Sequence, residues 1–471
     1  MKPELFDVVL RQDLLAFTQK CFETVLPGET FLSNWHLEAI AWHLEECYRG
    51  NIRRLIITLP PRSLKSIMAS VAFPAWVLGH DPGRRIICIS YSSDLSSKHA
   101  GDTRRVMERR WYGHAFPRTR LGGRNRELDF NTTAGGYRFA TSIGRTLTGR
   151  GGNLIIIDDS LKPDDALSDT KRRGVNEWYG RTLLSRLDNK ADDVIIVIQQ
   201  RLHMEDLVGH LLEQESGWAH LNLPAIAEED QIVRIGRNRI HERKAGDLLH
   251  PAREPQTVLD ELRRSMGSFA FSAQYQQNPL PIEGELIHWN WFGSYTALPA
   301  RKSGDRIYQS WDTASKGEEV NDYSVCTTWL QQGNLFYLID VYRAKLNYPD
   351  LRRKVGKLAE RHRPYAILIE DKGSGTSLIQ EFKFGPRGNM PVPIGITPKE
   401  DKVTRLSTQS AKIEAGQVLL PDKAPWLEAL KAEILQFPHG RHDDQVDSIS
   451  QFLQWIDDRS RNIWTQRSMF G

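Results

Sequence analysis

The sequence predicts an α/β protein with two folded domains joined by a connector. At 471 residues the chain is too long for one ordinary core. Short apolar runs alternate with helix-like stretches in the first half, and a second such alternation begins near Arg306, after a polar, proline-containing stretch. We therefore expect domains at residues 1–245 and 301–471, with a connector at 246–300.

The first domain is expected to contain a mainly parallel sheet. Its apolar runs are short and almost continuous, which is typical of strands buried on both faces with helices between them. Right-handed crossovers place the carboxyl ends of such strands at one edge, where ligands bind. The runs are Leu55–Leu59, Arg85–Ser90, Asn153–Ile157 and Val194–Ile198.

The segment Leu59–Ser66 follows the first run and opens a helix expected to extend to Leu78. This position suits a phosphate-binding loop, in which Lys65 would contact the β- and γ-phosphates and Ser66 would ligate Mg²⁺. The usual loop has glycine where Leu59 and Leu64 stand, and a Lys-Ser after a strand is, taken alone, more often an ordinary helix start.

Two carboxylates end the third apolar run and favour the loop interpretation. Asp158 is suited to holding Mg²⁺, and Asp159 to orienting the attacking water, although Asp159 could instead cap a helix. Gln200 follows the fourth run, where a polar side chain either senses the γ-phosphate or is simply solvated. Together these features predict a P-loop ATPase domain of the ASCE type. The residues expected to bind the nucleotide are Arg62, Ser63, Leu64, Lys65, Ser66, Asp158 and Gln200.

Other residues of the first half have weaker predicted roles. Arg62 is a candidate to neutralise transition-state charge, and Arg145 or Arg150 to do so for a neighbouring subunit. A helix beginning at Trp35-His36 either packs on the adenine or forms a core stripe. Between residues 104 and 126, eight arginines accompany a single acidic residue, with Trp111 and Tyr112 among them, which favours contact with a phosphate backbone.

The second half has the element order of a ribonuclease-H-like domain. The order is strand, hairpin, helix, strand and an acidic final helix. Gathered carboxylates repel one another unless a cation lies between them, and two Mg²⁺ or Mn²⁺ ions held this way hydrolyse phosphodiesters. The clusters are Asp312, then Glu370 and Asp371, then Asp443, Asp444 and Asp447. The pattern leaves open which member of each adjacent pair binds metal, and Asp443-Asp444 alone could merely complement a helix dipole.

With these residues in place, the chain resembles the large terminase subunit of tailed bacteriophages over nearly its whole length. The segments that carry the resemblance are Trp35-His36, residues 59–66, 154–159, Gln200-Arg201, 205–207, 273–279, Trp311 to Ala314, residues 370–373 and 442–447. Two positions depart from the family pattern, since Leu64 replaces a glycine and Asp159 replaces a glutamate.

The resemblance implies an ATP-driven packaging motor with a nuclease. Its expected cofactors are ATP and Mg²⁺, with Mn²⁺ able to serve the nuclease. Its expected partners are double-stranded DNA, the portal protein of the procapsid and a small terminase subunit, and the motor is expected to form a ring, a pentamer, when docked. A helicase-like ATPase–nuclease of repair or recombination, and a DNA-binding scaffold that no longer hydrolyses ATP, are the alternatives.

Composition fits this class. Apolar residues make up 40% and charged residues 26% of the chain, which is typical of a soluble globular protein. The four cysteines have no CxxC spacing, so we expect buried thiols in a reducing host cytoplasm. No apolar run is long enough to span a membrane.

Overall fold

The computed structural model describes residues 3–145, 147, 149–280, 286–313, 323–386, 388–398, 400–440 and 442–469. The chain forms two compact units, the first comprising Met1–Leu262 with Ser268–Leu280 and the second comprising Arg263–Gly267 with Pro281–Gly471. Each unit contains one large sheet between helices, so the predicted α/β class is confirmed. The four cysteines are free and buried, as expected.

The first unit contains an eight-stranded sheet with the order β3-β4-β5-β2-β6-β7-β1-β8. Its strands are β1 (Arg54–Thr58), β2 (Arg85–Ser90), β3 (Leu121–Asn125), β4 (Asp129–Thr132), β5 (Tyr137–Ser142), β6 (Leu154–Asp158), β7 (Val194–Gln199) and β8 (Ala219–Asn222). All pairs from β5 to β8 are parallel, and β3 and β4 extend the edge in antiparallel fashion. Strand β7 therefore lies between β1, which leads into the loop, and β6, which ends at Asp158.

Alternation along the central strands supplies two faces for helices to cover. Leu55 and Ile57 pack into one apolar cluster, whereas Ile56 between them packs into another on the opposite face. Helices therefore pack on both faces of this sheet. The first cluster includes residues of α1 (Pro3–Gln12), α2 (Leu14–Val25), α3 (Trp35–Tyr48), α4 (Phe73–His80), α5 (Ser93–Met107) and α6 (Arg110–Ala115); the second includes α7 (Asp169–Trp178) and α8 (Leu207–Gln214).

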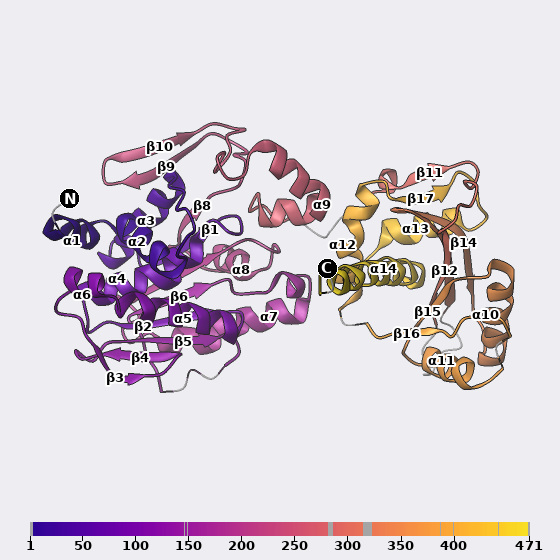
Figure 1. The fold of residues 1–471 in the computed structure, drawn as a ribbon, viewed down its shortest axis with the longest axis horizontal. Coiled ribbons are helices and arrows are strands. Elements are labelled where there is room, and N and C mark those ends of the chain that lie inside the picture. The colour runs from indigo at the N-terminus through magenta and orange to yellow at the C-terminus, as the bar shows by residue number, and fades with distance from the viewer. Residues whose placement is uncertain are drawn as a thin grey trace. The chain divides into compact units, whose positions relative to one another are not determined.

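The region after β8 holds more structure than the sequence predicts. Strands β9 (Gln231–Gly236) and β10 (Arg239–Arg243) form a hairpin over α3 (Figure 1). The connector contains the helix α9 (Gln256–Gln274), which is interrupted at Gly267 where φ is 81°. A left-handed φ of this kind favours glycine, so Gly267 permits the helix to break at that position.

The second unit contains a seven-stranded sheet with the order β11-β17-β14-β13-β12-β15-β16. Its strands are β11 (Gly293–Tyr295), β12 (Arg306–Asp312), β13 (Ser324–Gln332), β14 (Leu335–Ala344), β15 (Ala366–Glu370), β16 (Ile394–Ile396) and β17 (Val418–Pro421). Strand β13 is antiparallel to both β12 and β14, and β15 is parallel to β12. This is the predicted ribonuclease-H-like order of strands.

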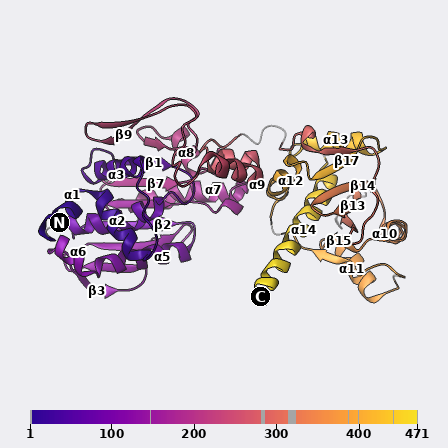
Figure 2. The same ribbon diagram turned by 45° about the horizontal axis from the view of Figure 1, so that its top comes forward.

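Helices cover both faces of the second sheet, as Figure 2 shows. One apolar cluster includes α12 (Lys402–Glu414), α13 (Leu427–Gln436) and α14 (Asp444–Met469), and the opposite cluster includes α10 (Tyr348–His362) and α11 (Ser374–Phe384). Helix α14 is tied to β12 by the Ser448 hydroxyl, which donates to the carbonyl oxygen of Ser310 at 2.8 Å. Within the described ranges, no helix is apolar over a length that would cross a bilayer.

Candidate functional site

The loop between β1 and α4 lies against a cavity of about 580 Å³ in the first unit. The backbone of Arg62 has φ 59° and that of Leu64 has φ 61°, so the loop takes left-handed turns at two non-glycine residues. Leu64 thus adopts the backbone conformation for which glycine is favoured. The cavity wall comprises residues 61–67 with Phe22, Leu26, Glu29, Thr30, Leu32, His36, Asp159, Gln200, Leu249, His250, Arg253 and Glu254.

The lysine and serine of the loop face the two carboxylates that end β6. Lys65 Nζ donates to Asp159 Oδ1 at 2.7 Å, and Ser66 Oγ donates to Asp158 Oδ1 at 3.0 Å. Asp159 has φ 50°, so the chain turns sharply at the strand end. Burial raises the pKa of both carboxyls, and the charge of Lys65 opposes this rise.

Asp158 is fully buried, and three further residues that the sequence did not indicate surround it. Ser70 Oγ donates to Asp158 Oδ2 at 2.7 Å, and Nη2 of the buried Arg138 donates to the Ser70 carbonyl at 2.9 Å. His99 Nδ1 approaches Asp158 Oδ2 at 3.5 Å, but burial lowers the pKa of His99 to about 4, so this contact is not an ion pair at neutral pH. Ser70 is one helical turn beyond Ser66, and that spacing is the only sequence signal that could have identified it.

The polar residues that end β7 have separate roles. The Gln199 side chain accepts a hydrogen bond from Ser160 Oγ at 2.6 Å, behind the strand end. Gln200 contributes to the cavity wall, and its buried Oε1 has no hydrogen-bond partner in the described part of the chain. Of the two, Gln200 is therefore placed to meet a ligand in the cavity.

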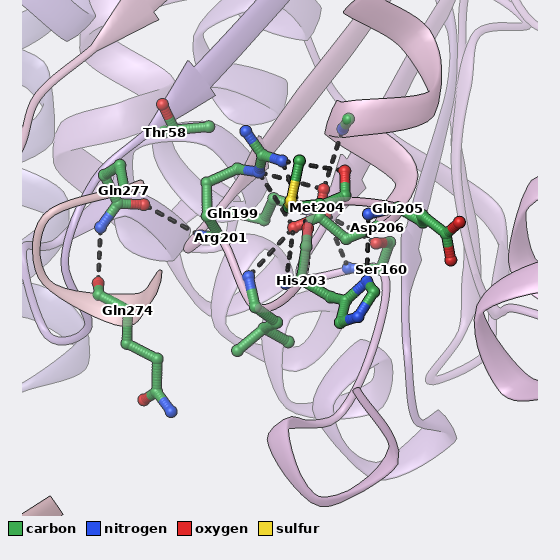
Figure 3. A network of polar contacts seen from close by, with 12 residues as sticks. Thr58, Ser160, Gln199, Arg201, His203, Met204, Glu205, Asp206, Gln274 and Gln277 are labelled. Carbon is green, nitrogen blue, oxygen red and sulfur yellow. Dashed lines mark hydrogen bonds and ion pairs between the residues drawn. The ribbon is translucent and has the colours of Figure 1, made fainter. Parts of the chain in front are cut away.

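Arg201, next along the chain, belongs to a structural network that joins the strand end to the connector (Figure 3). Its Nε donates to both carboxylate oxygens of the buried Asp206 at 3.0 Å, and Asp206 also caps α8 by accepting from Gly209 N. The backbone N–H of Arg201 donates to Gln277 Oε1 at 2.9 Å. Gln276 forms two 3.0 Å hydrogen bonds with the backbone of Ile226. The connector is thus fixed to the end of β7 just before the chain leaves the first unit at Leu280.

The two aromatic residues that begin α3 have different surroundings. His36 lines the cavity, whereas the Trp35 ring stacks on His241 of the hairpin with centroids 4.1 Å apart. Among the arginines suggested for a neighbouring subunit, Arg145 is exposed, but Arg150 forms an ion pair with Asp129 and lies over the Tyr137 ring.

The basic stretch between residues 104 and 126 covers the ends of α5 and α6 and the antiparallel edge of the sheet. Its arginines are exposed except Arg104, which is half-buried. The aromatic residues among them face inward, since Trp111 packs edge-on against Phe17, and the Tyr112 hydroxyl donates to the Ala75 carbonyl. Any contact of this surface with a polyanion therefore depends on guanidinium groups rather than on aromatic stacking.

In the second unit, the pairing of β12 with β15 brings two of the candidate carboxylates to one sheet edge. Trp311 is opposite Ile369 in the parallel register, so Asp312 and Glu370, which follow them, lie at neighbouring strand ends. Burial raises the pKa of Asp312 well above its usual range, and the negative charges of Asp447, Glu370 and Asp444 raise it further. These four carboxylates therefore interact electrostatically around Asp312.

Helix α14 supplies the rest of the acidic group. Asp444 begins the helix, and burial together with the charge of Glu433 raises its pKa to about 6. Asp447, one turn later, is 2% exposed. Asp443 precedes the helix, where its carboxylate is half-exposed and its backbone carbonyl accepts from the Asp447 N–H.

Two basic residues of α12, which the sequence analysis did not identify, contact these carboxylates. Lys402 Nζ lies 2.7 Å from Asp443 Oδ1 and 2.8 Å from Asp447 Oδ2. Arg405 Nη2 lies 2.7 Å from Asp447 Oδ1, and its Nη1 lies 3.9 Å from Glu370 Oε2. The donor set is carboxylate oxygen, which suits Mg²⁺ or Mn²⁺. In the present conformation, no three His, Cys, Asp or Glu side chains of the described residues are arranged to hold an ion.

Asp371 points away from this group. Its Oδ1 accepts from the Thr376 hydroxyl at 2.7 Å, and its backbone N–H donates to Ile396 of β16. The carbonyl of Glu370 lies where a Cβ on Gly375 would stand, at 2.0 Å, so glycine is required for the close start of α11. Ala314, part of the segment after Asp312 that carried the resemblance, lies outside the described residues.

Comparison with known proteins agrees with this geometry. Residues 309–454 match the family model of the terminase RNaseH-like domain. The large terminase of a thermophilic bacteriophage, in complex with ATP-γ-S, is similar with a TM-score of 0.52 and 11% identity, over 90% of this chain and 98% of that one. The complex of the same phage protein with ADP has a TM-score of 0.51 and 12% identity over the same shares.

The chain has the fold of a bacteriophage large terminase. The resemblance inferred from sequence motifs is thus confirmed, and so is the fold class, an α/β N-terminal domain with a mainly parallel sheet followed by a C-terminal RNaseH-like domain. A search of curated protein sequences gives no match. At this level of identity, the large-terminase fold was recognisable from the order of its motifs rather than from overall sequence similarity.

Proposed function

We propose that this chain is a large terminase subunit in which ATP hydrolysis drives double-stranded DNA into a procapsid and a two-metal nuclease cuts concatemeric DNA. The observation that carries the proposal is the convergence of Lys65 and Ser66 on Asp159 and Asp158 across the sheet edge. The large-terminase fold and the acidic group around Asp312 support the nuclease half.

In the nucleotide site, Lys65 exchanges its carboxylate partner for the phosphates of ATP. This exchange frees Asp159 to accept a proton from, and orient, the attacking water. Ser66 and Asp158 provide adjacent oxygens that would hold Mg²⁺, which neutralises phosphate charge when bound. Arg62 and the unpartnered Oε1 of Gln200 lie on the same cavity and are assigned to the transferring phosphoryl group and its water, respectively.

In the nuclease site, Asp312, Glu370, Asp444 and Asp447 would hold the divalent ions, with Asp443 beside them. Such ions supply an activated water and stabilise the leaving oxygen of a phosphodiester. Burial and mutual repulsion disfavour four charged carboxylates without a cation. By holding these carboxylates close together, the protein therefore favours the binding of a cation among them. Because Asp371 bonds to Thr376, we assign it to the support of this edge rather than to metal binding.

The proposed large-terminase function also implies which macromolecules the chain binds. The exposed arginines between residues 104 and 126 are proposed to contact the phosphate backbone of double-stranded DNA. The portal protein, a small terminase subunit and a pentameric ring of copies of this chain complete the proposed assembly. Arg145, which is exposed, is the candidate to reach a neighbouring subunit's nucleotide.

The test separates the two activities in the full-length protein. Lys65→Ala should lower DNA-stimulated ATPase activity by about 100-fold or more while plasmid cleavage with Mn²⁺ persists. Asp312→Ala should abolish plasmid cleavage with Mn²⁺ while DNA-stimulated ATPase activity persists. Lys98→Ala is the matched control, since Lys98 lies on α5 and pairs only with Asp102 among the described ion pairs. ATP turnover that survives Lys65→Ala would refute the nucleotide site, and cleavage that survives Asp312→Ala would refute the nuclease site.

A further inference from the structure

Lys402 occupies a distinctive position at the acidic group of the second unit. It is the first residue of α12, and its ammonium group lies between carboxylates of Asp443 and Asp447 at 2.7 and 2.8 Å. The side chain is nevertheless 49% exposed, so the ammonium reaches the group from the solvent side. A lysine stem is flexible and can move its charge into water at little steric cost.

Arg405, one turn further along α12, makes a different kind of contact. Its guanidinium is only 4% exposed and lies 2.7 Å from Asp447 and 3.9 Å from Glu370. A buried arginine cannot lose its proton or leave without exposing uncompensated carboxylates to a low dielectric. The two basic residues of α12 that contact the acidic group therefore differ in mobility, with Arg405 fixed and Lys402 displaceable.

We propose that Lys402 is the resident counter-cation of the nuclease carboxylates and that divalent metal binds only by displacing its ammonium group from Asp443 and Asp447. This inference rests on the proposed nuclease function. It goes beyond that function by assigning a role to a residue outside the acidic ligand set. Arg405 stays in place and keeps Asp447 and Glu370 oriented in both states.

The electrostatics determine the direction of the effect. Asp443 and Asp447 cannot both pair closely with an ammonium and with a divalent ion, because like charges a few ångströms apart repel strongly. Metal loading must therefore overcome the Lys402 ion pairs, which lowers the apparent metal affinity.

The experiment measures metal binding rather than cleavage. Mn²⁺ is titrated calorimetrically into the full-length protein without nucleotide, and the heat that disappears in Asp312→Asn is assigned to the nuclease site. Lys402→Met removes the charge, and Lys402→Arg retains it. The matched control is Lys412→Met, since Lys412 lies on the same helix and pairs with Asp457 of α14 away from the acidic group. Thermal unfolding of each variant is recorded in EDTA and in Mn²⁺.

Lys402→Met should bind Mn²⁺ about tenfold more tightly than wild type, whereas Lys402→Arg and Lys412→Met should not. In EDTA, Lys402→Met should also lower the unfolding temperature of the second unit by about 2–4 °C, and Mn²⁺ should abolish that difference. Unchanged or weaker Mn²⁺ binding in Lys402→Met would overturn the inference while leaving the nuclease intact. If Asp312→Asn binds Mn²⁺ as wild type does, the nuclease proposal fails and the inference fails with it.

Discussion

The left-handed backbone of Leu64 permits a test of the proposed nucleotide loop that does not depend on ATP. Leu64 has φ 61° and a half-buried side chain that packs against the core of the first unit. Replacing it by alanine or by glycine removes the same packing contacts, apart from one methyl group. The difference in stability between the two variants therefore reports the backbone conformation.

The magnitude follows from two opposing contributions. A left-handed φ costs a residue with a Cβ about 1–2 kcal/mol, a cost that glycine does not incur. Glycine in turn loses about 0.4–1 kcal/mol more chain entropy than alanine on folding. The first contribution is larger, so Leu64→Gly should be more stable than Leu64→Ala by about 0.5–1 kcal/mol.

The measurement is urea unfolding of the full-length variants, with the transition of the first unit followed at equilibrium. The control is Gln19 on the exposed face of α2, where ordinary helical geometry applies. There the order should invert, with Gln19→Ala more stable than Gln19→Gly by about 1 kcal/mol. If Leu64→Ala equals or exceeds Leu64→Gly in stability, the loop does not hold the left-handed turn and the nucleotide-site geometry is wrong.

Three further predictions concern other parts of the molecule. Burial lowers the pKa of His36 from 6.5 to about 3, so the unfolded state binds more protons as the pH falls below 6.5. The first unit should therefore lose about 2 kcal/mol between neutral pH and about pH 5 through this group, and denaturant unfolding of His36→Gln should show a correspondingly flatter pH profile. Glu370→Gln should lower Mn²⁺-dependent cleavage by more than about 100-fold, whereas Asp371→Asn, which alters only a supporting contact, should lower it by about 10–100-fold; the opposite order would mean that Asp371 rather than Glu370 binds the metal. Gln277→Ala leaves the buried N–H of Arg201 without its acceptor and should cost the first unit about 1–3 kcal/mol in urea unfolding, and an unchanged midpoint would argue against the contact.

The central parallel strands of the first unit could be predicted because burial on both faces leaves a continuous apolar run. Residues 55–58 and 194–198 are such runs, and the structure has β1 and β7 there. Strands β3 to β5 were missed because they extend an edge and include exposed, polar and glycine residues, such as Arg124 and Gly122, which give no apolar period. The pattern search follows apolar side chains, so it cannot detect a strand whose buried residues are polar, such as Arg138 and Thr141 of β5.

In the candidate sites, too, some residue contacts could be predicted from the sequence and others could not. Sequence order was enough to expect that Lys65 and Asp159 meet, because each follows a strand of one parallel sheet. Alternation along a strand implies that only one of Glu370 and Asp371 faces Asp312, but choosing between them requires the register of β15 on β12. Lys402 could not be found from sequence, since it meets Asp443 only after α12 packs on α14, about forty residues further along the chain.

Each of the two proposed sites contains a lysine–carboxylate ion pair, but the two pairs should have opposite effects on ligand binding. In each, a lysine pairs with a carboxylate at 2.7 Å, Lys65 with Asp159 in the first unit and Lys402 with Asp443 in the second. The first ligand, a polyphosphate, is an anion, so it takes the lysine as its partner and releases the carboxylate for chemistry. The second ligand is a cation, so it takes the carboxylate and releases the lysine. Removing Lys65 should therefore weaken ligand binding, whereas removing Lys402 should strengthen it, although both substitutions break an ion pair of the same length. A purely structural role for both lysines would instead predict the same direction of change at the two sites.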